Sequence, residues 1–257
     1  MNRHQQWIAF ATIVRKEIVR FLRIWTQTLL PPAVTMSLYF VVFGKLLGDR
    51  IQDFGDFTYI EFIVPGLVMM SVITNSFSNV ASSFFSSKFQ RSVEELLVSP
   101  VPDWLIVAAY VVGGAARGLI VGVVVLLVSL FFTKLQLHSL ALVILFFILT
   151  ALTFATAGFT NGMLARKFDD IAIVPTFVLT PLTYFGGVFY SIELLPGIWP
   201  TVSRANPILY MVNGLRYGFL GVSDIPVPVG IVILVIFLVV LFGFNLWLMK
   251  KGHGLRS

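Results

Sequence analysis

The sequence predicts an all-α polytopic membrane protein, because its apolar residues are too numerous and too evenly spread for a soluble domain. Of the 257 residues, 58% are hydrophobic and 12% are charged, and the mean hydropathy is +0.93. The apolar residues form runs of about 20 residues, the length that crosses the hydrocarbon core of a bilayer. A backbone in lipid must satisfy its own hydrogen bonds, so we expect these runs to be helices.

We predict six membrane-spanning helices and treat residues 1–257 as a single domain. Residues 27–249 are expected to form the six-span bundle, followed by a cytosolic tail at 250–257. No short-period repeat or flexible linker divides the chain. The six spans are predicted at 27–47, 60–82, 105–132, 139–163, 171–190 and 229–249.

Residues 1–26 predict an interfacial helix rather than a cleaved signal peptide. The segment is basic and lacks the uninterrupted apolar core of a signal sequence. Its apolar residues instead follow helical spacing and form one stripe, as expected of a helix that lies along the inner leaflet. An ordinary cytosolic helix is the alternative. The stripe comprises Trp7, Ala11, Val14, Ile18, Phe21 and Trp25.

The distribution of Lys and Arg predicts that both termini are cytosolic. With the termini inside, twelve of the 18 Lys and Arg residues lie on the cytosolic side and five lie outside. This asymmetry agrees with the tendency of cytosolic loops to carry the positive charge. The apolar run 208–220 is too short to cross, so we expect residues 191–228 to form an external hairpin of short helices that re-enters the outer leaflet before the last span.

The polar stretch 86–102, SSKFQRSVEELLVSPVP, predicts a short amphipathic cytosolic helix that ends at proline. One interpretation is a solvated loop helix, with Arg91 and Glu95 as an i,i+4 ion pair. The other is a coupling element whose apolar face and carboxylates dock to a motor subunit. The candidate docking residues are Phe89, Arg91, Glu94, Glu95, Leu96 and Leu97.

The third predicted span combines a glycine seam with a charge. Gly114, Gly118 and Gly122 recur every four residues, which predicts close packing against a helix of this chain or of a second copy. Arg117 lies among them, and a charge inside a span is costly. Because this span is longer than a crossing requires, we expect Arg117 to brace its cytosolic end; direct substrate contact is the alternative.

Polar side chains also follow one side of the second predicted span. Ser71, Thr74, Asn75 and Ser78 lie along that side. Polar groups in lipid seek partners, so the stripe faces either protein or a polar pathway. Hydrogen-bonded helix packing and the lining of a translocation pathway are both consistent with it.

The sequence offers no chemistry of its own. It has no cysteine, no GxxxxGK[ST] phosphate-binding motif, and no histidine within a predicted span. We therefore expect a protein that is not an enzyme and binds no cofactor or metal, so that transport against a gradient would need an external energy source. The net charge of +6 is explained by basic residues at the ends of spans, so we expect no nucleic-acid partner.

The ordered set of motifs resembles the permease subunits of type-2 ABC exporters, the ABC-2 type transporter family. The stretch 94–101, EELLVSPV, resembles the coupling segment of that family. The pairs Gly186-Gly187, Asn206-Pro207 and Leu215-Arg216 resemble its carboxyl-terminal pattern. The resemblance implies an inner-membrane homodimer bound to two copies of a separate ATPase, which would use ATP and Mg.

The resemblance also implies roles for individual residues. Glu94, Glu95, Leu96 and Leu97 would dock to the ATPase, and the external hairpin would shape or gate the exit of a hydrophobic or amphipathic substrate of the drug, lipid or glycan class. A stand-alone carrier or channel is the alternative function. Pro200 is expected to end the first hairpin helix early, and Asn213-Gly214 to loosen the second. The hairpin residues are Glu193, Pro196, Asn206, Pro207 and Arg216.

Overall fold

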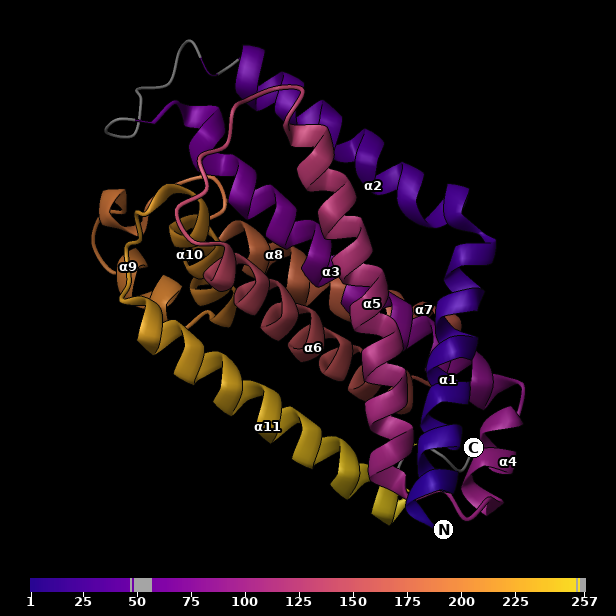
Figure 1. The fold of residues 1–257 in the computed structure, drawn as a ribbon. Helices are drawn as coiled ribbons and strands as arrows, with labels where there is room; N and C mark the ends of the chain where they lie inside the picture. The colour runs from indigo at the N-terminus through magenta and orange to yellow at the C-terminus, as the bar shows by residue number, and fades with distance from the viewer. Residues whose placement is uncertain (47, 49–56, 253, 255–257) are drawn as a thin grey trace.

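The computed structural model describes residues 1–46, 48, 57–252 and 254, and the elements it defines there are helices (Figure 1). Most are α-helices; η1 and η3 are π-helices and η4 is a 3-10 helix. In chain order the elements are α1 (Arg3–Arg23), α2 (Trp25–Tyr39), η1 (Phe40–Leu46), α3 (Tyr59–Phe89), α4 (Ser92–Val98), α5 (Asp103–Ser129), α6 (Leu140–Leu164), α7 (Phe168–Val174), η3 (Pro175–Leu179), α8 (Thr180–Tyr184), η4 (Ile192–Leu194), α9 (Trp199–Arg204), α10 (Pro207–Leu220) and α11 (Val227–Lys251).

Five helical segments of the described chain are long and apolar enough to cross a membrane. Each overlaps one of the predicted spans, so the all-helical polytopic class is confirmed. The six-span arrangement remains a prediction. The five segments are Trp25–Gly44, Tyr59–Phe89, Asp103–Ser129, Leu140–Leu164 and Val227–Lys251.

The predicted span at 171–190 is the exception. It corresponds to α7, η3 and α8, three consecutive helical segments of 7, 5 and 5 residues. Pro175 and Pro181 lie within this stretch, and each proline removes a backbone donor, so the hydrogen-bond pattern changes along it. Helical structure ends at Tyr184 rather than at residue 190.

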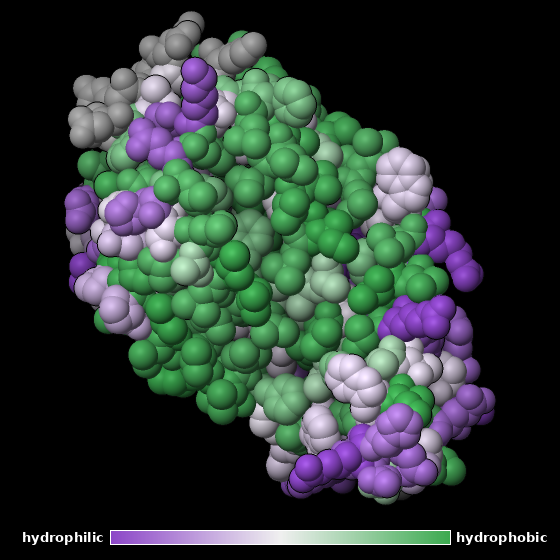
Figure 2. Space-filling model, in the orientation of Figure 1, coloured by the Kyte–Doolittle hydropathy of each residue, from purple (hydrophilic) through white to green (hydrophobic). Residues whose placement is uncertain are grey.

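α3 is the central helix of the bundle. It packs against α5, α6 and α10, and 78% of its most apolar 18-residue window is buried. α11 lies at the edge, where the corresponding share is 11%. The apolar outer surface extends between two polar ends of the molecule (Figure 2). Both termini and α4 lie at the same end, whereas α9 and α10 lie at the other (Figure 1).

The polar stretch 86–102 is not a single helix, contrary to the sequence prediction. Residues 86–89 are the last residues of α3, the chain turns at Gln90 and Arg91, and α4 follows from Ser92 to Val98. Arg91 has a φ of 59°, in the left-handed region that makes this tight turn possible. Phe89 therefore belongs to α3, and it does not lie on α4 with the other predicted docking residues.

α1 is helical as expected, and the side that it buries against the bundle shares Phe21 with the apolar stripe, which was expected to face the leaflet. Its buried residues are Ile13, Glu17 and Phe21, which face α5. Trp7 and Trp25, at the two ends of the predicted stripe, are 66% and 58% exposed. The helix thus buries a carboxylate and leaves large apolar side chains on its outer side.

Residues 191–228 contain two short α-helices, as predicted. The expectations that Pro200 would end the first helix early and that Asn213-Gly214 would loosen the second are both wrong. Pro200 lies in the first turn of α9, where a missing backbone donor costs little, so it begins the helix rather than ending it. Asn213 and Gly214 are buried in α10, and a Cβ on Gly214 would overlap the ring of Phe146. This half of the hairpin is tightly packed.

Candidate functional site

The outer side of α4 forms an exposed surface of mixed apolar and acidic character. Val98 is 88% exposed, Leu97 is 37% exposed, and Glu94 and Glu95 are also exposed. Val93 is the residue of α4 that is buried, at 1% exposure. We call Phe89, Glu94, Glu95, Leu97 and Val98 the α4 surface. Phe89 extends it from the end of α3 and is 65% exposed.

The turn between α3 and α4 is held by short-range contacts. The Ser92 hydroxyl donates to the carbonyl oxygen of Ser87 at 3.1 Å. Arg91 and Glu95 form no ion pair in the described part of the chain, since Arg91 precedes the helix that contains Glu95. Leu96 is half-buried and packs against the core. Leu96 thus faces inward, whereas the other predicted docking residues are exposed.

Behind α4, the ends of three helices are joined. Lys88 Nζ, in the last turn of α3, donates to the carbonyl oxygens of Met163 (2.9 Å) and Ala165 (2.6 Å) at the end of α6. The Phe89 ring contacts the Phe168 ring of α7 edge-on, at 5.0 Å between centroids. These contacts connect the α3–α4 turn to the end of α6 and to α7.

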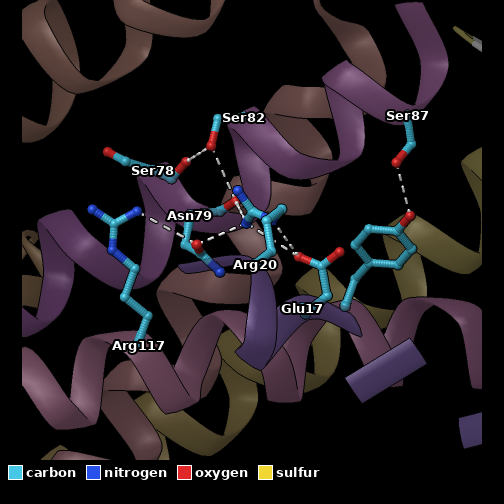
Figure 3. A network of polar contacts seen from close by, with 8 residues as sticks. Glu17, Arg20, Ser78, Asn79, Ser82, Ser87 and Arg117 are labelled. Atoms are coloured by element: carbon cyan, nitrogen blue, oxygen red, sulfur yellow. Dashed lines mark hydrogen bonds and ion pairs between the residues drawn. The ribbon is translucent and has the colours of Figure 1, made fainter. Parts of the chain in front are cut away.

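A buried polar network joins α1, α3 and α5 (Figure 3). Asn79 of α3 is fully buried, and its Oδ1 accepts hydrogen bonds from Arg20 of α1 (2.8 Å) and Arg117 of α5 (3.4 Å). Arg20 also forms an ion pair with Glu17 at 3.2 Å. Arg117 donates a second bond to Asn75 Oδ1 at 3.3 Å. Arg117 is thus engaged in joining helices.

The glycines of α5 lie against α3 of the same chain. A Cβ on Gly114 would overlap Val80, and one on Gly118 would overlap the Ser76 hydroxyl. A Cβ on Gly122 would lie 2.5 Å from Val72 Cγ2 and 2.8 Å from the Phe147 ring of α6. Backbones approach closely along this seam, so the structure places it inside the subunit.

The polar stripe on α3 divides into two parts. Ser71 and Asn75 are buried, and each donates to the backbone carbonyl four residues earlier, at 3.2 and 3.0 Å. Thr74 is exposed and Ser78 is half-buried. Helix packing therefore accounts for Ser71 and Asn75, whereas Thr74 and Ser78 are the candidate pathway residues that a substrate could reach.

At the opposite end of the molecule, Arg216 of α10 is buried, with 1% exposure. Its guanidinium donates to the carbonyl oxygen of Gly187 at 2.6 Å and to that of Phe62 at 3.4 Å, and its central carbon lies 3.7 Å from the centroid of the Phe62 ring. These contacts connect α10 to α3 and to the chain that follows α8. Arg216 is thus a structural clamp of the hairpin.

The other predicted hairpin residues lie at the same end in different environments. Asn206 caps α10, because its Oδ1 accepts from the Ile208 backbone at 3.0 Å, and its amide donates to Leu182 at 2.5 Å. Pro207 occupies the first turn of α10. Glu193, in η4, and Pro196 are exposed.

Sequence reasoning missed Glu17 and Asp224. Glu17 lies four residues from both Ile13 and Phe21, so a carboxylate at the centre of a buried helical face was the available signal. Asp224 accepts bonds from the Ser191 hydroxyl (2.8 Å) and the Ile192 backbone (3.0 Å), and thus closes the hairpin. No sequence pattern singled it out. In the described residues, no group of three or more His, Cys, Asp and Glu could hold a metal.

A bundle of span-length apolar helices, joined by buried polar contacts and polar at both ends, defines a polytopic helical membrane protein. The chain belongs to the ABC-2 type transporter family, whose model matches residues 8–220. It is therefore a membrane component of an ABC transporter.

Two groups of relatives extend this assignment over nearly the whole chain. The chain is 57% identical over 254 residues to the inner membrane transport permease YadH of Escherichia coli (strain K12), covering 99% of both chains. It is 24% identical over 246 residues to nodulation protein J of Rhizobium leguminosarum bv. trifolii, covering 95% of this chain and 93% of the relative. Nodulation protein J of Rhizobium meliloti (strain 1021) is similar to the same extent, at 24% identity.

Proposed function

We propose that this chain is the membrane-spanning permease of an ATP-driven exporter in the inner membrane, and that a separate ATPase docks on the α4 surface. The exposure of Glu94, Glu95, Leu97 and Val98 carries this proposal, because no described part of the chain covers them. Exposed apolar residues beside charges are typical of a surface that binds another protein. The E. coli relative is an inner membrane transport permease, which supports the location.

The contacts of α3 suggest how docking could drive transport. α4 is connected to α3 through a two-residue turn, and α3 packs against α5, α6 and α10. Movement of a bound ATPase would displace the turn, and the close-packed α3–α5 seam would move as a unit. ATP and Mg would be bound by the ATPase, in two copies on a permease homodimer. This chain would bind neither and would not itself be a catalyst.

The proposed substrate is hydrophobic or amphipathic, of the drug, lipid or glycan class. Thr74 and Ser78 offer polar contacts on the accessible part of α3. The face of the bundle shown in Figure 2 is broadly apolar between its polar ends. In the proposed topology both termini and α4 are cytosolic, which agrees with the Lys and Arg bias of the loops and with their common position at one end (Figure 1).

The test is co-purification of the ATPase with a Glu94→Ala/Glu95→Ala variant of the tagged permease. We expect recovery of the ATPase to fall about tenfold, because complementary charges guide and hold such interfaces. Lys134→Ala removes an exposed charge from the loop between α5 and α6 and is the control. Full ATPase recovery and full transport by the double variant would remove the α4 surface from the coupling role.

The alternative of a stand-alone carrier or channel makes a different prediction for the same preparation. Reconstituted permease without any ATPase would then transport substrate at a rate independent of ATP. The proposed exporter requires the opposite result: transport appears only when the ATPase and ATP are both present.

A further inference from the structure

The outer side of α1 contains a basic hollow that the transport role does not explain. Its volume is about 680 Å³, and residues of α1 and of the turn after it line it. The hollow lies where α1 ends and the first span-length helical segment begins, at Trp25. The lining residues used below are Arg15, Lys16, Val19, Arg20, Arg23 and Ile24.

Three of these cations have no acidic partner in the described chain. Arg15, Lys16 and Arg23 are exposed, and the ion pair found among the described residues joins Arg20 to Glu17. Glu17 is 1% exposed and faces α5. Its carboxylate pairs with Arg20 and points away from the hollow, so it does not neutralise the other three cations. The hollow therefore presents three uncompensated positive charges.

Apolar groups adjoin the cations. Val19 and Ile24 are 43% and 42% exposed in the wall of the hollow. Trp7 and Trp25, exposed on the same helix and just after it, are of the residue type that gathers at the level of lipid headgroups. A ligand that fits both features has an anionic head and an apolar tail.

The position of the hollow indicates which ligand of this kind it would bind. Arg23 lies two residues before a span-length apolar helix, which places it near the boundary between headgroups and hydrocarbon. Arg20 is held inward by Asn79, so α1 is fixed against the bundle with its cationic side outward (Figure 3). The cations thus face the surface of the leaflet at the end that holds both termini.

We propose that this hollow binds the headgroup of an anionic phospholipid. Arg15, Lys16 and Arg23 hold the phosphate, and the acyl chains run along Val19 and Ile24 into the bilayer. Binding at this place requires only that α1 lies at the membrane surface. It is independent of the docking of an ATPase on α4, so the two proposals stand or fail separately.

The test uses the full-length permease in detergent and counts bound lipid by native mass spectrometry. Dioctanoylphosphatidylglycerol is titrated against dioctanoylphosphatidylcholine. We expect the anionic lipid to bind on the order of 100-fold more tightly, since each basic residue near an anionic surface contributes roughly fivefold. The variant Arg15→Gln/Lys16→Gln/Arg23→Gln should lose this preference.

A matched variant controls for the loss of charge. Lys134→Gln/Lys250→Gln/Lys251→Gln removes three exposed cations elsewhere and should keep the preference. Thermal unfolding checks that both variants are folded; if the α1 triple variant is not, the three single substitutions should each cost roughly fivefold.

Four results would overturn the proposal. The first is equal binding of the two lipids by the unaltered protein, and the second is an equal loss in the two triple variants. Complete displacement of the lipid by inorganic phosphate at the same concentration would show that the apolar wall has no part in binding. Tighter binding of a polyglutamate peptide than of phosphatidylglycerol would identify an acidic protein segment as the occupant.

Discussion

Selected polar side chains at the two ends of the bundle lie in opposite environments. At the α9–α10 end, Arg216, Asn206 and Asp224 are engaged by backbone and side-chain partners within the chain. At the α4 end, Glu94 and Glu95 are exposed and have no hydrogen-bond partner for their side chains among the described residues. These three residues of the first end are engaged by the chain itself, whereas the two carboxylates of α4 are available to a partner.

This difference separates stability from interaction. A buried polar group that loses its partner costs free energy, so substitutions at the α9–α10 end should lower the stability of the isolated protein. An exposed residue with few internal contacts contributes little to folding, so substitutions on the α4 surface should act on partner binding. The following experiments test this separation, from the largest expected effect to the smallest.

The largest loss of stability is expected for Arg216→Met. The substitution removes the donors to Gly187 and Phe62 and leaves two buried carbonyl oxygens without them. We expect the free energy of unfolding to fall by about 3 kcal/mol, since hydrogen bonds to charged groups contribute about 1.5–3 kcal/mol each. Thermal unfolding of the purified protein in detergent measures the change.

Arg204→Met is the control for Arg216→Met. Arg204 is exposed in α9, at the same end of the molecule, and its side chain forms no hydrogen bond in the described chain. Its replacement should leave the melting temperature nearly unchanged. Equal losses in the two variants would show that buried contacts are not what closes this end.

Asn206→Ala should give the next largest loss, about 2 kcal/mol. One part is the helix cap to Ile208, for which about 1 kcal/mol is typical. The other part is the carbonyl oxygen of Leu182, which loses its donor. Ser139→Ala is the control, because Ser139 occupies the N-cap position of α6 without a side-chain cap bond. A larger loss for Ser139→Ala would contradict the assignment of the cap.

Gly118→Ala tests the seam that connects the two ends. The new methyl group would overlap the Ser76 hydroxyl and lie 3.0 Å from the carbonyl oxygen of Val72. Overpacking of this kind typically costs about 1–3 kcal/mol, partly offset by the better helix propensity of alanine, so we expect a net loss of about 1 kcal/mol. Adding Ser76→Ala should recover part of it, and thermal unfolding measures both variants.

The matched substitution for the seam is Gly243→Ala. Gly243 lies in α11, and a Cβ there would have no neighbour within 4 Å. The same chemical change should therefore raise stability slightly. If Gly118→Ala is as harmless as Gly243→Ala, the seam is looser than the structure indicates.

The smallest effect is expected from Asp170, at the α4 end. Backbone N–H groups of Arg166 and Lys167 donate to its carboxylate and lower the pKa of Asp170 below its ordinary value of 3.8. A lowered pKa stabilises the fold above pH 3.8, and this contribution is lost as the pH falls through the folded-state pKa. Melting temperatures of the unaltered protein and of Asp170→Asn between pH 6 and about pH 3 should converge at the acid end. A constant difference would exclude this titration.

The class of fold and the order of the helices follow from features that sequence records directly. Runs such as Leu140–Leu164 and Val227–Lys251 are strongly apolar. Whether such a run contacts lipid or protein, its backbone groups must bond to each other, and a helix achieves this. The glycine spacing likewise predicted that α5 packs closely against another helix, because a residue without a side chain lets a second backbone approach, whichever helix that backbone belongs to. The identity of that partner, α3, required the three-dimensional arrangement.

The errors occur where a local pattern depends on distant contacts. Periodicity joined Phe89 to Leu96 in one helix, yet a left-handed Arg91 separates them. The apolar stripe of α1, expected to face the leaflet, gave no sign that the side facing α5 buries Glu17, which pairs with Arg20. Single-sequence periodicity cannot anticipate that Arg20, which pairs with Glu17 within α1, also donates to Asn79 of another helix, 59 positions away.

The network at Asn79 also constrains the order in which the protein assembles. α1 is made before its partner in α3: Asn79 follows Arg20 by 59 positions, and at about 5–20 residues per second this takes roughly 3–12 s. Glu17 lies against Gly113, which is synthesised later still. During that interval the carboxylate of α1 has no bundle to be buried in. α1 therefore cannot reach its final position until α3 and α5 have been made.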